Sequence, residues 1–170
     1  TGENGKTMVG NNNVFMAYAH IAHDCIVGNN CIIANCGTLA GHVTIEDSVV
    51  VGGLVAIHQF VRVGRLAIIG GCSKVVQDVL PFSTCDGHPA RIYGLNLIGL
   101  RRSSIGKESI EKLNRAFKIL FNLGLSIKHA LDRIEKEIKP SDEISYLLKF
   151  IKESKRGIAR SCRIGRISAE

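Results

Sequence analysis

A six-residue period runs through the first half of the chain and limits its fold more than any other feature. From Val9 to Val75, every sixth residue is large and apolar. These positions are Val9, Phe15, Ile21, Val27, Ile33, Leu39, Ile45, Val51, Ile57, Val63, Ile69 and Val75. A step of six residues turns an α-helical side chain by about 600°, so these residues would not share one helix face. The period instead predicts a β-solenoid of hexapeptide repeats.

A second register lies two residues before the first and holds small or β-branched residues, while Gly or Ala often follows the large residue. In such a solenoid each hexad supplies a short strand and a corner, three hexads close a coil, and coils stack about 4.8 Å apart. The twelve hexads therefore predict four coils. Because the chain starts at Thr1 without Met and enters the repeat almost at once, we expect the C-terminal portion of a longer solenoid.

The period ends after Val75, which divides the chain into four predicted segments. Residues 1–80 form the β-helix, and residues 81–103, which begin at Pro81 and are rich in turn residues, form a connector. Residues 104–160 form a small α-helical domain, and residues 161–170 form a tail.

Helical spacing replaces the six-residue period in the third segment. Its first apolar stripe consists of Ile110, Leu113, Phe117 and Leu120. Gly124 follows as a stop signal, and two further helices are predicted over 126–139 and 141–154. We expect this helical unit to cap the last coil or to pack on a neighbour.

The six cysteines form no C-x-x-C pair, and no secretory leader is visible. We therefore expect reduced thiols in a cytoplasmic protein rather than a disulfide framework. No apolar run approaches the roughly 20 residues that cross a bilayer, so no transmembrane segment is predicted.

The formal net charge of +7 is concentrated late in the chain and favours an acidic partner. Nucleic acid is not favoured, because no aromatic residues are interleaved with the basic ones to stack on bases. A phosphorylated small molecule or an acidic carrier protein fits the charge, and so does a solvated helix face without a partner.

Four histidines fall outside both inward registers and are predicted to point outward or to stand at corners, where they are available for chemistry. They are His20, His23, His42 and His58. Stacking by 18 residues places His23, Gly41, Gln59 and Gln77 in one column, with Asp24, His42 and Phe60 in the column beside it. This arrangement is typical of a catalytic cleft.

His23 is the candidate general base, because imidazole titrates near neutral pH without special burial. Asp24 is the candidate orienting carboxylate, and it could hold either His23 or His42. The N–H of Gly41 is a candidate donor to an oxyanion. A zinc ion shared by outward histidines is the alternative, but the predicted chemistry uses no metal.

Several motifs resemble those of one known family. The strings HIAHDC, LAGHV, AIHQF and IGGCS lie between His20 and Ser73, and GLNLIGLRR follows from Gly94. With these spacings the chain closely resembles the acyl-[acyl-carrier-protein]–UDP-N-acetylglucosamine O-acyltransferases that start lipid A synthesis. The resemblance extends through the helical segment to Arg160 and does not cover the tail.

The resemblance implies a left-handed parallel β-helix that forms a homotrimer with active sites between subunits. His23 matches the family's general base, Asp24 its orienting carboxylate and Gly41 its oxyanion donor. The implied substrate-binding residues are His20, His42, His58, Gln59, Asn96 and Arg102. Asn96 and Arg102 match nucleotide-binding positions, so the segment 81–103 is also the implied nucleotide-contacting loop. The implied substrates are UDP-N-acetylglucosamine and the thioester of a 3-hydroxyacyl carrier protein, with no cofactor.

Gly71 matches the position that sets acyl-chain length in the family. It lies about 2.7 coils beyond His23, a rise on the order of 13 Å, and a glycine there predicts a long acyl chain. A tight turn is the simpler interpretation of the same glycine. The chain departs from the family pattern at Ile98, where many members have an acidic group, and at Ser103, where a second Arg is common.

Three functions are compatible with these observations. The preferred one is transfer of an (R)-3-hydroxyacyl chain from acyl carrier protein to the 3-position of UDP-N-acetylglucosamine. The alternatives are another hexapeptide-repeat acyltransferase, either the lipid A N-acyltransferase or an enzyme that uses acetyl-CoA, and a non-catalytic solenoid module.

Overall fold

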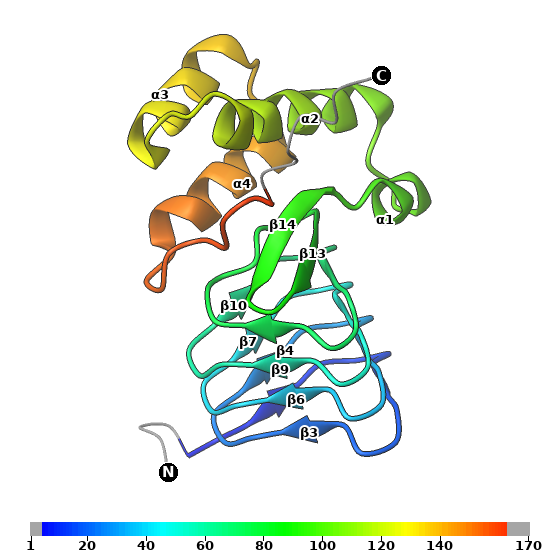
Figure 1. The fold of residues 1–170 in the computed structure, drawn as a ribbon. Helices are drawn as coiled ribbons and strands as arrows, with labels where there is room; N and C mark the ends of the chain where they lie inside the picture. The colour runs from blue at the N-terminus through cyan, green and yellow to red at the C-terminus, as the bar shows by residue number, and fades with distance from the viewer. Residues whose placement is uncertain (1–4, 163–170) are drawn as a thin grey trace, which may run out of the picture.

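A computed structural model describes residues 5–162, in which a β-solenoid carries a helical unit at one end (Figure 1). Twelve two-residue strands form three sheets that make the three sides of the solenoid. Sheet A contains β1 (Met8–Val9), β4 (Ile26–Val27), β7 (Thr44–Ile45) and β10 (Arg62–Val63). Sheet B contains β2 (Val14–Phe15), β5 (Ile32–Ile33), β8 (Val50–Val51) and β11 (Ile68–Ile69). Sheet C contains β3 (His20–Ile21), β6 (Thr38–Leu39), β9 (Ala56–Ile57) and β12 (Lys74–Val75).

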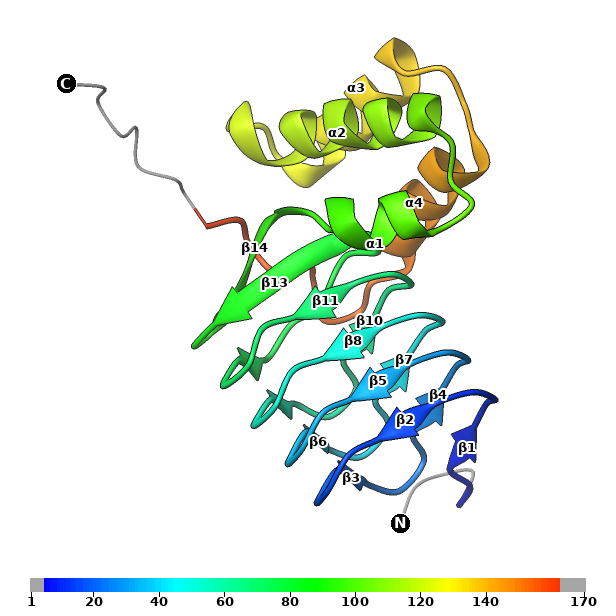
Figure 2. The ribbon, with the colours of Figure 1, turned by 90° about the vertical axis from the view of Figure 1, so that its right-hand side faces the viewer.

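The strands of each sheet pair in parallel with a register of 18 residues, as the stacked coils in Figure 2 show. Ile26, for example, pairs with Met8 on one side and with Thr44 on the other. The predicted parallel β-helix with three hexads per coil is therefore confirmed.

The solenoid interior is filled by the two predicted inward registers. From Val27 to Val75 every large residue of the first register is buried. The second register is buried as well, from Cys25 to Ser73. Only the first coil departs from this pattern, because Val9 and Phe15 lie at the open end of the ladder and are 47% and 40% exposed.

The corners share one backbone conformation. In each hexad from Asn12 to Cys72, one non-glycine corner residue has a positive φ, between 57° and 64°. This left-handed conformation is costly for most side chains. Backbone hydrogen bonds between coils hold it, such as that from His42 N–H to the carbonyl of His23 at 3.0 Å.

The ladder continues beyond the predicted end of the β-helix. Val79 bridges Val63, and β13 (Ser83–Gly87) pairs in parallel with β11, with Cys85 opposite Ile69. Both pairings span 16 residues instead of 18, so the last coil is two residues shorter than the others. The six-residue period therefore ends one coil before the solenoid ends. The β-helix thus extends past its predicted end at residue 80 into the segment predicted as a connector, residues 81–103.

Two further elements occupy the same segment. Strand β14 (Ala90–Leu95) pairs with β13 in antiparallel fashion and adds a hairpin to sheet B. Helix α1 (Leu97–Arg102) follows directly. It is too short to show a helical apolar period, which is why the sequence pattern did not predict it.

The helical unit contains the three predicted helices. They are α2 (Lys107–Asn122), α3 (Ile127–Glu137) and α4 (Asp142–Glu153). The hydroxyls of Ser126 and Ser141 cap α3 and α4 by accepting from backbone N–H groups three residues later. The predicted stripe of the first helix is largely buried, with Leu113, Phe117 and Leu120 each at most 5% exposed. Of the predicted tail, only residues 161 and 162 lie within the described part of the chain.

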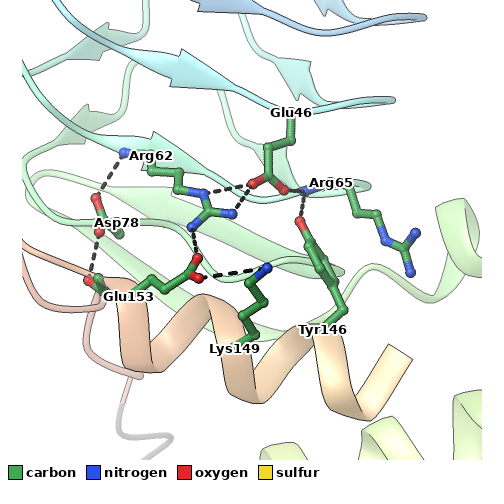
Figure 3. A network of polar contacts seen from close by, with 8 residues as sticks. Glu46, Arg62, Arg65, Asp78, Tyr146, Lys149 and Glu153 are labelled. Carbon is green, nitrogen blue, oxygen red and sulfur yellow. Dashed lines mark hydrogen bonds and ion pairs between the residues drawn. The ribbon is translucent and has the colours of Figure 1, made fainter. Parts of the chain in front are cut away.

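Helix α4 attaches the helical unit to the last coils through a polar network (Figure 3). The Arg62 guanidinium contacts Glu46 at 2.6 Å and Glu153 of α4 at 3.2 Å. The hydroxyl of Ser154 donates to the buried carboxylate of Asp78 at 2.6 Å, and Asp78 accepts the backbone N–H of Arg62 at 2.8 Å. The expectation that the helical unit caps the last coil is confirmed. Among residues 5–162, no helix is long and apolar enough to cross a membrane.

Candidate active site

The candidate base and its carboxylate lie at the corner that joins sheet C to sheet A, which we call the C–A corner (residues 22–25, 40–43 and 58–61). The Nδ1 atom of His23 lies 2.9 Å from Oδ2 of Asp24. Because a carboxylate can only accept, Nδ1 is the donor of this hydrogen bond, and in a neutral ring the lone pair is then on Nε2. The His23 side chain is 54% exposed and that of Asp24 only 4%, so a buried acceptor orients an accessible imidazole.

The structure shows a hydrogen bond between Asp24 and His23. Asp24 has a φ of 57°, the left-handed corner conformation, and its carboxylate reaches the ring of His23. Its other oxygen accepts the backbone N–H of Lys6 at 3.2 Å. The sequence left the choice between His23 and His42 open, because it depends on this corner conformation.

Gly41 lies one coil above His23 and directly against its ring. A Cβ atom at Gly41 would stand 2.5 Å from Cε1 and 2.6 Å from Nε2 of His23. Real Cβ atoms do not approach other atoms so closely, so only glycine leaves room for the imidazole in this position. The predicted column of His23 and Gly41 is confirmed.

An aromatic column continues from the base along the C–A corner. The ring of His42 meets that of His23 edge to face, with centroids 5.2 Å apart at 90°. The ring of Phe60 stacks on His42 at 4.6 Å and 15°. Phe60 is 53% exposed. The 18-residue register placed Phe60 in this column, but nothing in its residue type assigned it a role.

The remaining predicted histidines also face outward. His20 is the outward residue of β3, and His58 stands at the C–A corner one coil beyond Gly41. His58 and Gln59 are both exposed, and Nδ1 of His58 lies 3.2 Å from the carbonyl oxygen of Gln59. Among the described residues, only His23, Asp24 and His42 form a group that could hold a metal ion.

Gly71 lies at a different corner from His23. It is part of the turn between β11 and β12, which joins sheet B to sheet C. The rise of about 13 Å predicted from the coil spacing therefore covers only the axial component. On one chain, a path from His23 to Gly71 must also cross the outer face of sheet C. Gly71 is exposed, and a Cβ atom there would meet only the backbone of Gly53, at 3.3 Å.

Asn96 has both polar groups of its side chain engaged within the chain. Its carbonyl accepts Gly99 N–H at 2.9 Å and caps α1, and its amide donates to the Leu66 carbonyl at 2.9 Å. In this structure Asn96 thus fastens α1 to the solenoid. Arg102 lies exposed in the last turn of α1, near the exposed Ile98.

Stacked coils with three hexads each define the chain as a hexapeptide-repeat β-solenoid protein. A family model described as "Bacterial transferase hexapeptide (six repeats)" matches residues 6–41. A second, described as "Udp N-acetylglucosamine O-acyltransferase; Domain 2", matches residues 78–159.

Individual proteins agree with these two family models. The chain is 51% identical over 155 residues to the acyl-[acyl-carrier-protein]–UDP-N-acetylglucosamine O-acyltransferase of Campylobacter concisus, covering 91% of this chain and 58% of that protein. It is 45% identical over 135 residues to the enzyme of the same name from Gloeothece citriformis, covering 79% of this chain and 49% of that protein. The chain therefore spans about half to three fifths of the length of these curated relatives.

Solved structures show the same relationship. The UDP-N-acetylglucosamine O-acyltransferase of Moraxella catarrhalis superposes with a TM-score of 0.87 at 39% identity, covering 92% of this chain and 61% of that one. The UDP-N-acetylglucosamine acyltransferase of Campylobacter jejuni superposes with a TM-score of 0.83 at 36% identity, covering 95% and 73%. The chain belongs to the UDP-N-acetylglucosamine O-acyltransferase family.

Proposed function

We propose that this chain supplies the catalytic corner of an enzyme that transfers an (R)-3-hydroxyacyl chain from acyl carrier protein to the 3-position of UDP-N-acetylglucosamine. The observation that carries the proposal is the pair of His23 and Asp24, in which a nearly buried carboxylate accepts from Nδ1–H of a histidine whose side chain is 54% exposed. The names of the relatives support the choice of donor and acceptor.

In the proposed reaction, Nε2 of His23 removes the proton of the sugar 3-hydroxyl as its oxygen attacks the thioester carbonyl carbon. Asp24 stabilises the imidazolium that forms. The tetrahedral intermediate then collapses, the C–S bond breaks, and the carrier thiolate receives the proton from His23. The thioester is a co-substrate, and the reaction as proposed needs no cofactor.

The N–H of Gly41 is the proposed donor to the oxyanion of this intermediate. Gly41 accepts the backbone N–H of Phe60 at 3.2 Å through its carbonyl, whereas among the hydrogen bonds of residues 5–162 its own N–H donates to none. A donor of this kind is typically worth 10²- to 10³-fold in kcat. His20, His42, His58 and Gln59 surround the corner and are proposed to line the sugar and acyl pockets.

We propose the nucleotide-binding role of Arg102 on its guanidinium, which suits a diphosphate. Asn96 is proposed to act there through α1, since its side chain holds that helix in place. The long-chain preference proposed from Gly71 is supported by the exposure of that residue, which places no side chain at this corner.

The partner proposals are a homotrimer and a docked acyl carrier protein. The outer face of sheet B supports self-association, because the outward residues of its four solenoid strands β2, β5, β8 and β11 are all apolar. They are Val14, Ile32, Val50 and Ile68. The exposed cations Arg101, Arg102 and Lys118 favour an acidic carrier protein. The unpaired state of the six cysteines supports a reducing compartment, the cytoplasm.

The test is acyl transfer by a full-length protein that carries this segment. We expect product from 3-hydroxyacyl carrier protein and UDP-N-acetylglucosamine, with the acyl group on the 3-oxygen. Product with acetyl-CoA as sole donor would favour the alternative acyltransferase. If no acyl group is transferred from either donor, a non-catalytic module is favoured.

A further inference from the structure

We propose that His23, Asp24 and His42 form a reversible Zn²⁺ site, and that zinc bound there switches off the base. The metal site depends only on the geometry of the C–A corner, whereas its inhibitory effect rests on the proposed function. The ion is an inhibitor in this proposal and takes no part in acyl transfer.

The three side chains already lie close to the spacing of metal ligands. One donor atom from each can be chosen so that all three lie within 4.8 Å of one another. Nδ1 of His23 and Oδ2 of Asp24 are 2.9 Å apart. Two ligands of a tetrahedral zinc ion, each about 2.0–2.2 Å from the metal, stand roughly 3.4 Å apart. The His23–Asp24 pair therefore needs little movement, and the ligand atom of His42 has to approach by at most about 1.4 Å.

The donor set selects the metal. Two imidazoles and one carboxylate suit Zn²⁺, whereas Mg²⁺ and Ca²⁺ prefer sites made of oxygen. Three protein ligands leave a fourth position for water. The 54% exposure of the His23 side chain keeps that position open to solvent.

Zinc and catalysis require the same lone pairs. Zinc on Nδ1 replaces the proton that His23 donates to Asp24, so the neutral ring must carry its proton on Nε2, where the base lone pair was. Zinc on Nε2 occupies that lone pair directly. In either arrangement His23 cannot accept the proton of a hydroxyl group.

Cysteine is the main competing ligand on this chain. Cys72 is exposed and Cys36 partly so, and thiolates bind zinc well. Co²⁺ separates the two cases, because sulfur ligands give a charge-transfer band that nitrogen and oxygen ligands lack.

The test is equilibrium dialysis of the chain against chelator-buffered Zn²⁺ at neutral pH, with the Co²⁺ spectrum as a second readout. The variants are His23→Gln and His42→Asn, since Asn tolerates the φ of 61° at that corner. The control is His129→Gln, on exposed α3. We expect one Zn²⁺ per chain, no sulfur band, at least a tenfold weaker affinity in both variants, and wild-type affinity in the control.

The proposal is overturned if zinc does not bind, if either variant retains wild-type affinity, or if Co²⁺ shows a sulfur band. In the full-length enzyme, the same free zinc concentrations should inhibit transfer, and full activity in zinc-loaded protein would refute the inhibitory step. If the protein transfers no acyl group at all, the proposed function fails while dialysis still decides the metal site.

Discussion

The imidazole of His23 occupies the space that a side chain on Gly41 would need. A Cβ atom there would lie 2.5 Å from Cε1 and 2.6 Å from Nε2, the atom proposed to take the proton. The base therefore depends on a glycine 18 residues away, because the coil spacing brings the two corners together.

Gly41→Ala should displace the ring of His23 and lower kcat by about 10²-fold or more, because a small misplacement of a catalytic group is costly. The matched control is Gly106→Ala, where an added Cβ meets nothing within 4 Å. Steady-state kinetics on both variants, with unfolding curves, provide the measurement. A Gly41→Ala enzyme as active as the Gly106→Ala control would contradict the proposed packing.

Asp24→Asn should lower kcat by about 10²- to 10⁴-fold with little effect on folding. Asn tolerates the φ of 57° at this corner, so the backbone should be unchanged. The loss comes from a neutral amide that no longer stabilises the imidazolium. Unchanged kcat with a raised KM would assign Asp24 to substrate binding instead.

Gly71→Met should shift donor preference toward shorter acyl chains, because a long side chain would project from this exposed corner into the proposed path of the acyl chain. The measurement is the ratio of kcat/KM for long and short 3-hydroxyacyl donors. Gly71→Ala is the matched control and should change this ratio less. If Gly71→Met leaves this ratio unchanged, Gly71 does not set the acyl-chain length.

The network between α4 and the solenoid predicts unequal losses of stability. Arg62→Met should lower the free energy of unfolding by about 1–3 kcal/mol, because it removes the partner of Glu46 and a cation–π contact 4.4 Å from the centre of the Phe150 ring. Glu153→Gln should cost under about 1 kcal/mol, since that carboxylate is 48% exposed. Denaturant titration measures both, and a larger loss for Glu153→Gln would show that the second ion pair dominates.

The thiols should react in the order of their exposure. Burial raises the pKa of Cys85 to about 12, and burial also raises the pKa values of Cys25 and Cys31. Because the thiolate is the reactive form, these thiols stay protonated and inert at pH 8, whereas exposed Cys72 should react. Mass spectrometry after brief alkylation locates the label. Rapid labelling of Cys85 in folded protein would contradict the burial of this thiol in the core.

The solenoid could be predicted from the sequence because its signal is local and repeated. An error of one residue in the six-residue register would turn every inward residue from Val27 to Val75 outward, so the repeated apolar pattern allows only one register. The same dependence on an 18-residue coil explains the failure near Pro81. The coil there is two residues shorter, so the ladder that pairs Cys85 with Ile69 left no trace in the period.

Contacts between distant segments were beyond the sequence pattern. The hydrogen bond between Arg62 and Glu153 joins residues 91 positions apart. No spacing rule in the sequence relates strand β10, which contains Arg62, to the end of helix α4. The partner of Asp24 was undecided for a related reason, since it follows from a backbone conformation rather than from residue type. The engaged side chain of Asn96 likewise depends on α1, which was too short to be predicted.

The most direct test of this account is the rate of 3-O-acylation by a His23→Ala variant of a full-length enzyme that carries this segment. His129→Gln serves as its control, because that histidine lies on α3, outside the C–A corner. We predict that His23→Ala lowers kcat by at least about 10²-fold while the control keeps the wild-type rate. Retention of wild-type kcat by His23→Ala would contradict the assignment of His23 as the base.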